Sequence, residues 1–278
     1  MKIKTSAKIN LNLAIKSSEV SHLHRIESLM VPIDLYDEIN IDRNSKDNDS
    51  IIFKNNLELT NHSTIHKALV CLRNNTDLDN FFNIRINKKI PIEAGLGGGS
   101  SDAAAVMVSI SKICDLQLPA FSTITKEVGS DVPFFINGRS AVVKNVGDKI
   151  EDYNIAHDIF FLIIIPTFGL STKAVFNLWD RIQNDDTAAD SFPLTRDVTI
   201  FNHALEPAMR LKPEIKSLKD SIEKLLGERV FMTGTGSTLF SIFDSEEEAA
   251  DAKSKINIDN RLILVAKKID YSYKELSD

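Results

Sequence analysis

The stretch "PIEAGLGGGSSDAAAV" (residues 91–106) places four glycines and two serines in front of a run of alanines. Glycines let backbone N–H groups approach an anion closely, and a helix that follows adds unpaired N–H groups and the positive end of its dipole. The alanine-rich segment from Ser100 to Cys114 is expected to be that helix. The stretch therefore predicts a phosphate site, with a tight strand-to-helix turn between closely packed elements as the structural alternative.

Two common phosphate-binding motifs do not fit this loop. A Walker A loop needs a lysine directly after its glycines, and here Ser100 stands in that place. A dinucleotide-binding fold has its glycine turn directly after the first strand of a βαβ unit, whereas this loop lies far into the chain. The phosphate site must therefore be of another kind.

The composition is that of a globular protein with a sizeable core. The chain has 278 residues, enough for one large domain or two smaller ones, with 43% hydrophobic and 26% charged residues. Its net charge of −6 argues against a general nucleic-acid binder. Cys71 and Cys114 lie in apolar stretches and are expected to be reduced core residues. The apolar run 159–165 is too short to cross a bilayer, so we expect a cytoplasmic protein without a membrane partner.

The pattern along the chain predicts both strands and helices. Residues 3–15 alternate strictly, which predicts one half-buried strand with Lys8 and Asn10 together on its polar face. Pro133 is expected to hold Val132 extended and so to exclude a helix there. Further strands are expected at 27–41, 159–165, 229–243 (two strands around a glycine turn) and 261–269, and helices at 63–73, 120–129, 172–182, 213–227 and 245–256.

The glycine loop resembles a motif of a known enzyme family. The pattern P-x-x-x-G-L-G-G-G-S-S-D-A-A (91–104) is similar to the second motif of the GHMP kinase superfamily. Most members have Gly-Leu-Gly-Ser-Ser, and the triple glycine resembles the branch that phosphorylates a cytidine-diphosphate sugar alcohol in non-mevalonate isoprenoid synthesis. The resemblance implies a two-domain α+β fold: a ribosomal protein S5 domain 2-like, ATP-binding domain over 1–150 and a ferredoxin-like domain over 151–278.

Two other segments carry the catalytic residues that this resemblance implies. "AKINLNL" (7–13) resembles the first family motif, which makes Lys8 the catalytic lysine and Asn10 a substrate contact. "GSDVPFF" (129–135) resembles the segment with the catalytic aspartate, here Asp131. A carboxylate beside an alcohol can accept its proton, and a neighbouring ammonium keeps that carboxylate ionised. Without the resemblance, the lysine would be a solvated strand residue and the aspartate a turn residue that bonds its own backbone.

The remaining site residues follow from the same resemblance. The third motif, "MTGTGSTLFSIF" (232–243), implies substrate contacts by Gly234, Gly236 and Ser237, with a glycine-rich hairpin as the alternative. "LSTKAVF" (170–176) implies that Phe176 stacks on the cytosine, and a core aromatic is the alternative. The ATP-binding residues implied are Lys88, Pro91, Ile92, Glu93, Ala94, Gly95, Leu96, Gly97, Gly98, Gly99, Ser100 and Ser101.

The sequence departs from the family pattern at two places. The family has Gly-Tyr-His around the cytosine, and here His22-Leu23-His24 stands instead, which keeps His24 as a substrate contact but removes the aromatic ring. Ser63 replaces an asparagine that helps to hold adenine. The base pockets are therefore expected to differ in detail from those of the family.

The resemblance as a whole implies an ATP-dependent kinase with an alcohol acceptor. Mg²⁺ is expected to ride mainly on the ATP phosphates, with no protein metal ligand assigned, and the protein to be a monomer or homodimer. A GHMP kinase of the homoserine or mevalonate type is the alternative in the same class, against which the triple glycine, Asn10, His24 and Phe176 argue. A non-catalytic GHMP-fold binding protein is the other alternative, and it should have lost Lys8 or Asp131.

Overall fold

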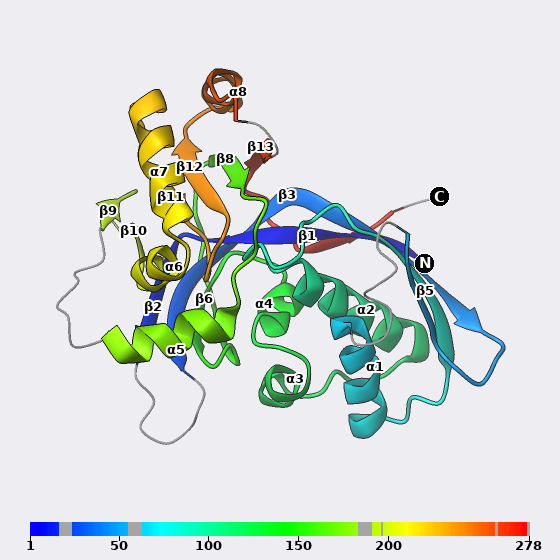
Figure 1. Cartoon of the computed structure of the whole chain (residues 1–278). Helices are drawn as coiled ribbons and strands as arrows, with labels where there is room; N and C mark the ends of the chain where they lie inside the picture. Colours follow the sequence, from blue (N-terminus) through cyan, green and yellow to red (C-terminus); the bar gives the residue numbers. More distant parts are fainter. Residues whose placement is uncertain (17–23, 55–62, 183–190, 196, 259–260, 277–278) are drawn as a thin grey trace.

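The structure, a computed structural model, describes residues 1–16, 24–54, 63–182, 191–195, 197–258 and 261–276, whose strands form two sheets (Figure 1). The larger sheet has the strand order β14, β1, β3, β2, β10 and β9. Strands β5 and β6 also pair with β3, and β4 pairs with β5 while β7 pairs with β6. The larger sheet consists of β1 (Lys2–Asn10), β2 (Asn12–Lys16), β3 (Arg25–Asn44), β4 (Ser50–Phe53), β5 (Phe81–Asn87), β6 (Ala141–Asn145), β7 (Lys149–Asp152), β9 (Phe192–Pro193), β10 (Thr199–Asn202) and β14 (Tyr273–Glu275). The smaller sheet has the order β11 (Phe231–Met232), β12 (Leu239–Phe243), β8 (Phe160–Ile165) and β13 (Leu262–Lys267).

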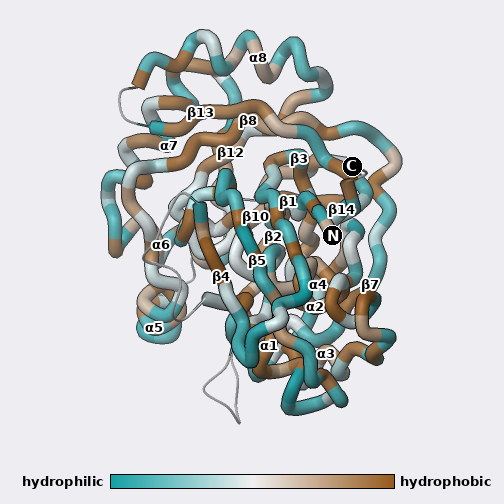
Figure 2. Tube along the Cα trace, turned by 90° about the vertical axis from the view of Figure 1, so that its right-hand side faces the viewer, coloured by the Kyte–Doolittle hydropathy of each residue, from teal (hydrophilic) through white to brown (hydrophobic). Residues whose placement is uncertain are grey.

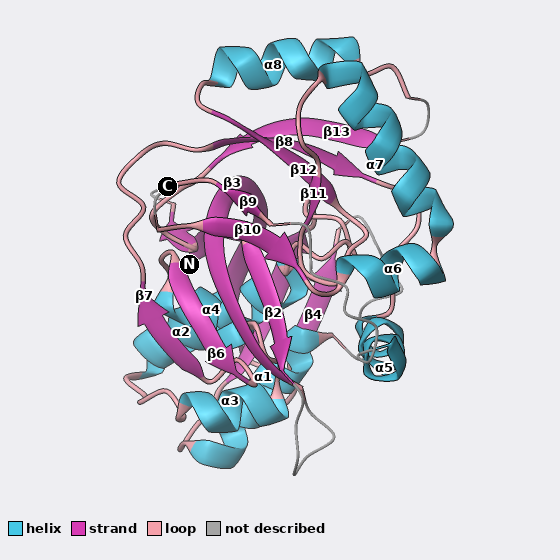
Figure 3. Ribbon diagram, turned by 90° about the vertical axis from the view of Figure 1, so that its left-hand side faces the viewer, coloured by secondary structure: helices cyan, strands magenta, loops and turns pink. Residues whose placement is uncertain are grey.

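Most of the helices cover the outer faces of the two sheets, as Figure 3 shows. One group packs on the larger sheet: α1 (Thr64–Asn75), α2 (Gly98–Cys114), α3 (Phe121–Glu127) and α4 (Val132–Asn137). The other group belongs to the second half of the chain: α5 (Thr172–Ile182), α6 (Leu205–Leu211), α7 (Pro213–Leu226) and α8 (Glu246–Lys255). The largely apolar β8 runs between α8 and the larger sheet (Figure 2), so that one core lies between the two sheets and another beneath α7 and α8.

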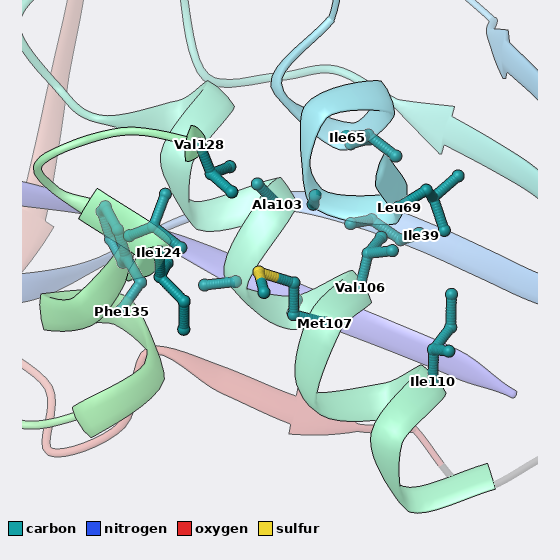
Figure 4. Close-up of a cluster of buried hydrophobic side chains, with 14 of the residues drawn as sticks. Ile39, Ile65, Leu69, Ala103, Val106, Met107, Ile110, Ile124, Val128 and Phe135 are labelled. Atoms are coloured by element: carbon teal, nitrogen blue, oxygen red, sulfur yellow. The ribbon is translucent and has the colours of Figure 1, made fainter. Parts of the chain in front are cut away.

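Helix α2 lies at the centre of the first helical layer. Its Ala103 and Met107 are fully buried among Ile39 of β3, Leu69 of α1 and Phe135 of α4 (Figure 4). Alanine has no side chain beyond Cβ, so the alanine-rich start of α2 can pack closely against its neighbours. The expected helix is confirmed, and it begins at Gly98, two residues earlier than expected.

The alternating segment 3–15 is not one half-buried strand. It forms β1 and β2, and the register of β1 against β3 shifts between Ser6 and Ala7. Ile3 packs in the core under α2, whereas Ala7 belongs to the core between the sheets. The irregularity in the pairing therefore interrupts the single apolar face that alternation predicts. The expectation that the polar face of this segment is exposed to solvent is also wrong, because Lys8 and Asn10 are each only 3% exposed.

The expectation that Pro133 excludes a helix is wrong. Val132–Asn137 is helix α4, with Pro133 in its first turn and Gly138 at its C-cap. A proline at the start of a helix removes an N–H that has no partner within the helix, and its fixed φ suits the helical backbone. The proline therefore begins this helix instead of preventing it.

The helices expected at 213–227 and 245–256 are confirmed as α7 and α8. Helix α7 has Pro213 in its first turn and Gly227 at its C-cap with φ +75°. At the start of α8 the Ser245 side chain accepts a hydrogen bond from the N–H of Glu248. These two helices begin and end at the signals that their sequences carry.

Strands from the second half of the chain complete the larger sheet. β10 pairs in parallel with β2, and β14 pairs in antiparallel with β1. The larger sheet therefore contains strands from both sides of residue 150, where the domain boundary is expected. The position of that boundary stays a prediction. Among the described residues, no helix is long and apolar enough to cross a membrane.

Two glycines with positive φ provide a test of backbone packing. Gly147 has φ +101°, and a Cβ placed there would lie 2.1 Å from the carbonyl oxygen of Ser130, next to Asp131. Gly227 has φ +75°, and a Cβ there would meet nothing within 4 Å. Gly147→Ala should therefore lower the free energy of unfolding by about 3 kcal/mol or more, and Gly227→Ala by about 1 kcal/mol, the cost of the left-handed backbone alone. Urea denaturation of both variants checks this, and equal losses would contradict the contact at Ser130.

Candidate active site

The glycine loop meets strand β1 at the start of α2. The backbone N–H of Lys8 donates to the carbonyl oxygen of Leu96 at 3.0 Å. Gly97, which follows Leu96, is the N-cap of α2 with φ +73°, and no side chain caps the helix. A Cβ at Gly97 would lie 2.9 Å from the ring of Phe135 and 3.1 Å from Cγ of Lys8. The start of α2 therefore lies beside the Lys8 side chain and has no capping side chain, so its first N–H groups are of the kind that bind anions.

A cavity of about 620 Å³ lies beside this helix terminus. Most of the residues expected from the sequence line it: Lys8, Asn10, Lys88, Pro91, Ile92, Glu93, Ala94, Gly95, Gly97, Gly98, Gly99, Ser100, Asp131, Phe176 and Gly234. They come from β1, the glycine loop, the starts of α2 and α4, helix α5 and the glycine turn after β11. The structure thus brings the three expected motifs to one place.

Lys8 and Asp131 form an ion pair in this cavity. The Nζ of Lys8 lies 3.6 Å from Oδ2 of Asp131, and the two side chains are 4% and 23% exposed. Asp131 is the N-cap of α4, but its side chain does not bond the helix backbone. Its carboxylate therefore does not cap the helix, the role that was the alternative to catalysis, and it faces the ammonium group of Lys8.

Four of the residues expected from the two glycine motifs lie outside the cavity wall. Leu96 is buried in the core between the sheets. Ser101 is fully buried, and its hydroxyl pairs with Thr5 of β1 instead of facing the cavity. Ser237 donates to the carbonyl oxygen of Phe168 at 2.5 Å. The expectation that both serine hydroxyls of the loop face a phosphate therefore fails for Ser101, because its place on the helix turns it towards β1.

The fourth, Gly236, joins the two glycine turns by their backbones. A Cβ on Gly95 would lie 2.9 Å from the carbonyl oxygen of Gly236 and 2.8 Å from that of Thr233. The N–H of Thr238 also donates to the carbonyl oxygen of Ala94 at 3.3 Å. Gly95 and Gly236 therefore serve the close packing of the two turns, a role that sequence reasoning did not assign.

Lys88 bridges the two ends of the glycine loop. Its ammonium donates to Asp37 of β3 and, at 2.8 Å, to Asp102 in the first turns of α2. Asp37 also accepts the N–H groups of Lys89 (2.5 Å) and Ile90 (2.9 Å), where the chain enters the loop. The sequence pointed to Lys88 but not to its two carboxylate partners. Both are buried, and their distance along the chain conceals the contact.

Burial and charge set the protonation of this triad. Burial raises the pKa of Asp102 to about 8, Lys88 opposes the rise and Asp37 adds to it. The other oxygen of Asp102 is buried and has no hydrogen-bond partner among the described residues. Burial lowers the pKa of Lys88, but the two carboxylates outweigh it and the net shift is upwards. Lys88 therefore keeps its ammonium charge between the two carboxyl groups.

At the far end of the cavity, an aromatic group forms around His24. Its ring stacks on Phe176 with centroids 4.8 Å apart and an angle of 10°, and it lies nearly perpendicular to the ring of Trp179 with centroids 5.7 Å apart. Its Nε2 lies 2.7 Å from Oδ1 of Asp180. Phe176 lines the cavity. His24 does not line the cavity itself but stacks on Phe176. His22 and Leu23, the other members of the altered triplet, lie outside the described residues.

Comparison with known proteins identifies the family. The model of the GHMP kinases N terminal domain matches residues 63–139, and that of the GHMP kinases C terminal matches 193–261. A protein of Clostridium tetani named 4-diphosphocytidyl-2-C-methyl-D-erythritol kinase is 32% identical, over 97% of this chain and 100% of its own. The chain belongs to the GHMP kinases, in the family of that enzyme. A kinase of the same name from Caldicellulosiruptor bescii is 30% identical, over 93% of this chain and 94% of its own.

Solved structures of GHMP kinases share the fold. The crystal structure of a 4-(cytidine 5'-diphospho)-2C-methyl-D-erythritol kinase superposes with a TM-score of 0.76 at 24% identity, covering 96% of this chain and 99% of that one. A homoserine kinase from Cytophaga hutchinsonii superposes with a TM-score of 0.67 at 15% identity, covering 99% and 96%. The two-domain GHMP kinase fold expected from the motifs is therefore confirmed.

The triad of this GHMP kinase gives a matched test. Lys88 is 8% exposed and pairs with two buried carboxylates, whereas its neighbour Lys89 is 52% exposed and pairs with Glu38 on the surface. Lys88→Met should lower the free energy of unfolding by about 3–5 kcal/mol, since it leaves buried carboxylates without their ammonium. Lys89→Met should cost less than about 1 kcal/mol. Chemical denaturation at neutral pH measures both, and a loss below about 1 kcal/mol for Lys88→Met would mean that the triad is not a buried charge cluster in solution.

Proposed function

We propose that this GHMP kinase transfers the γ-phosphoryl group of ATP to the 2-hydroxyl of 4-diphosphocytidyl-2-C-methyl-D-erythritol. The products are the 2-phosphate and ADP, and the step belongs to the non-mevalonate (MEP) route of isoprenoid precursor synthesis. The observation that carries the proposal is the Lys8–Asp131 pair, 3.6 Å apart, in the same cavity as the uncapped start of α2. As a cytoplasmic enzyme acting on two small molecules, the protein would work as a monomer or a homodimer.

Asp131 and Lys8 would act at the acceptor hydroxyl. A bond forms between the hydroxyl oxygen and the γ-phosphorus while the bond from that phosphorus to the β–γ bridging oxygen breaks, and the hydroxyl proton passes to the Asp131 carboxylate. Phosphoryl transfer depends chiefly on positioning and on neutralising the charge of the three equatorial oxygens. The Lys8 ammonium, 4% exposed, would supply that charge beside Asp131.

The start of α2 would hold the ATP phosphates. Its N–H groups have no capping side chain, and the helix dipole favours an anion at this end. Ser100, unlike Ser101, lines the cavity, and its hydroxyl would contact a phosphate oxygen. Mg²⁺ would arrive on the phosphates, since it prefers oxygen ligands and keeps much of its water shell. Charge neutralisation is the chemistry that the ion supplies when bound.

The adenine and cytosine ends would lie on opposite sides of these phosphates. Phe53, Ser63 and Ile65 line the cavity near the start of α1, where the altered adenine contact falls. There Ser63 caps α1, since its hydroxyl accepts from the N–H of His66 at 3.3 Å. Phe176 and His24 would bind the cytosine, because stacked flat rings suit a base. Asn10 also lines the cavity and would contact the acceptor.

An ADP-release assay tests the reaction and the role of Asp131 together. With Mg-ATP the wild-type enzyme should phosphorylate 4-diphosphocytidyl-2-C-methyl-D-erythritol, and Asp131→Asn should lower kcat by at least about 100-fold, since it removes the proton acceptor. Asp270→Asn, at a carboxylate that pairs with Lys268 outside the cavity, is the control and should leave kcat unchanged. Turnover of homoserine or mevalonate in place of the cytidylyl substrate would contradict the proposal, and wild-type kcat in Asp131→Asn would remove Asp131 from the chemistry.

A further inference from the structure

The side-chain amide of Asn10 lies at the centre of a buried hydrogen-bond network. Its Oδ1 accepts from the Lys8 ammonium and, at 3.3 Å, from the hydroxyl of Thr233. Its Nδ2 donates to the hydroxyl of Ser28 at 2.8 Å. Asn10 is 3% exposed, and Ser28 and Thr233 are fully buried. The three residues of this network, of which Asn10 bonds Lys8, therefore come from β1, from β3 and from the turn after β11.

Donor and acceptor counts fix the direction of the Ser28 bond. A hydroxyl has one proton to donate and lone pairs to accept with. Ser28 donates its proton to the carbonyl oxygen of Asn12 at 2.5 Å. It can therefore only accept from Asn10, so the atom of the amide that faces it must be the NH₂ group.

The same count applies on the side of Thr233. The Thr233 hydroxyl accepts the backbone N–H of Asn10 at 2.9 Å, which leaves its proton for the amide oxygen of Asn10. The two hydroxyls thus specify the same orientation of the amide from opposite sides. In that orientation the oxygen faces the Lys8 ammonium, whereas the opposite orientation would place an NH₂ group against it.

We propose that Thr233, together with Ser28, is a positioning residue for catalysis: its hydroxyl orients the Asn10 amide so that Lys8 is held towards Asp131. The inference rests on the proposed function, because Lys8 matters for rate only if it acts at the transferring phosphoryl group. Asn10 then has a second role besides the expected substrate contact, since its amide oxygen is already occupied by Lys8. The family motif that contains Thr233 suggested only Gly234, Gly236 and Ser237 as functional residues.

Thr238 offers a matched control within the same turn. Its backbone carbonyl accepts the N–H of Thr233 at 3.1 Å, and both threonines are fully buried. Among the described residues the hydroxyl of Thr238 has no hydrogen-bond partner. A change of threonine to valine keeps the shape and removes the hydroxyl, so the two positions separate the hydrogen bond from the packing.

The experiment compares Thr233→Val, Thr233→Ser and Thr238→Val with the wild type in the ADP-release assay. Thr233→Val should lower kcat about tenfold, the effect of one lost hydrogen bond to a charged network, while KM for ATP and for the cytidylyl substrate changes less than about twofold. Thr233→Ser should restore kcat to within about threefold, and Thr238→Val should leave it within about twofold. If the wild type turns over and Thr233→Val behaves like Thr238→Val, the positioning role is wrong while the proposed function stands.

A second measurement does not require turnover. Acylation of Lys8 by an amine-reactive reagent, followed by mass spectrometry of the intact protein and its peptides, reports how firmly the ammonium is held. Thr233→Val should accelerate modification of Lys8 severalfold, whereas Thr233→Ser and Thr238→Val should match the wild type. An equal rate in all four proteins would overturn the inference even if the wild type shows no kinase activity, which by itself would refute only the proposed function.

Discussion

The active site depends on the close approach of strand β1 to the start of helix α2. The Lys8 N–H bonds the Leu96 carbonyl, and the missing Cβ of Gly97 leaves room for the Lys8 stem on one side and the Phe135 ring on the other. This contact places an ammonium group beside an uncapped helix terminus. Both features attract phosphate, and neither would form a kinase site without the other.

The two buried lysines of the cavity wall differ in how their charge is balanced. Lys88 is bonded by two carboxylates that are 0% and 2% exposed. Lys8 is bonded by a neutral amide and faces one carboxylate, Asp131, at 3.6 Å. Attraction falls with distance and with the number of anions that already surround a cation. In the proposed reaction Lys8 is therefore the ammonium whose charge would act on the transferring phosphoryl group, whereas Lys88 ties the ends of the loop together.

The sequence predicts the local parts of this site better than their orientation. The glycine loop, the helix after it and the shared direction of Lys8 and Asn10 follow from spacing and residue type alone. The direction of the Ser101 side chain, away from the cavity and towards β1, could not be predicted, because its partner Thr5 lies 96 residues away in sequence. Helix α4 was missed because the rule for a residue before proline does not hold in the first turn of a helix.

The parts that sequence could not predict are those that join the two halves of the chain. Thr233 lies 223 residues from Asn10, yet its hydroxyl meets the amide and the backbone of that residue. The same turn packs on Gly95 through backbone atoms, with no side chain between them to absorb a shift. A displacement of this turn would therefore disturb the Lys8 network and the glycine loop together. Phosphate binding and the alignment of the lysine thus share one structural requirement, the docking of residues 233–238 against β1, and this explains why the turn combines glycines with a buried threonine.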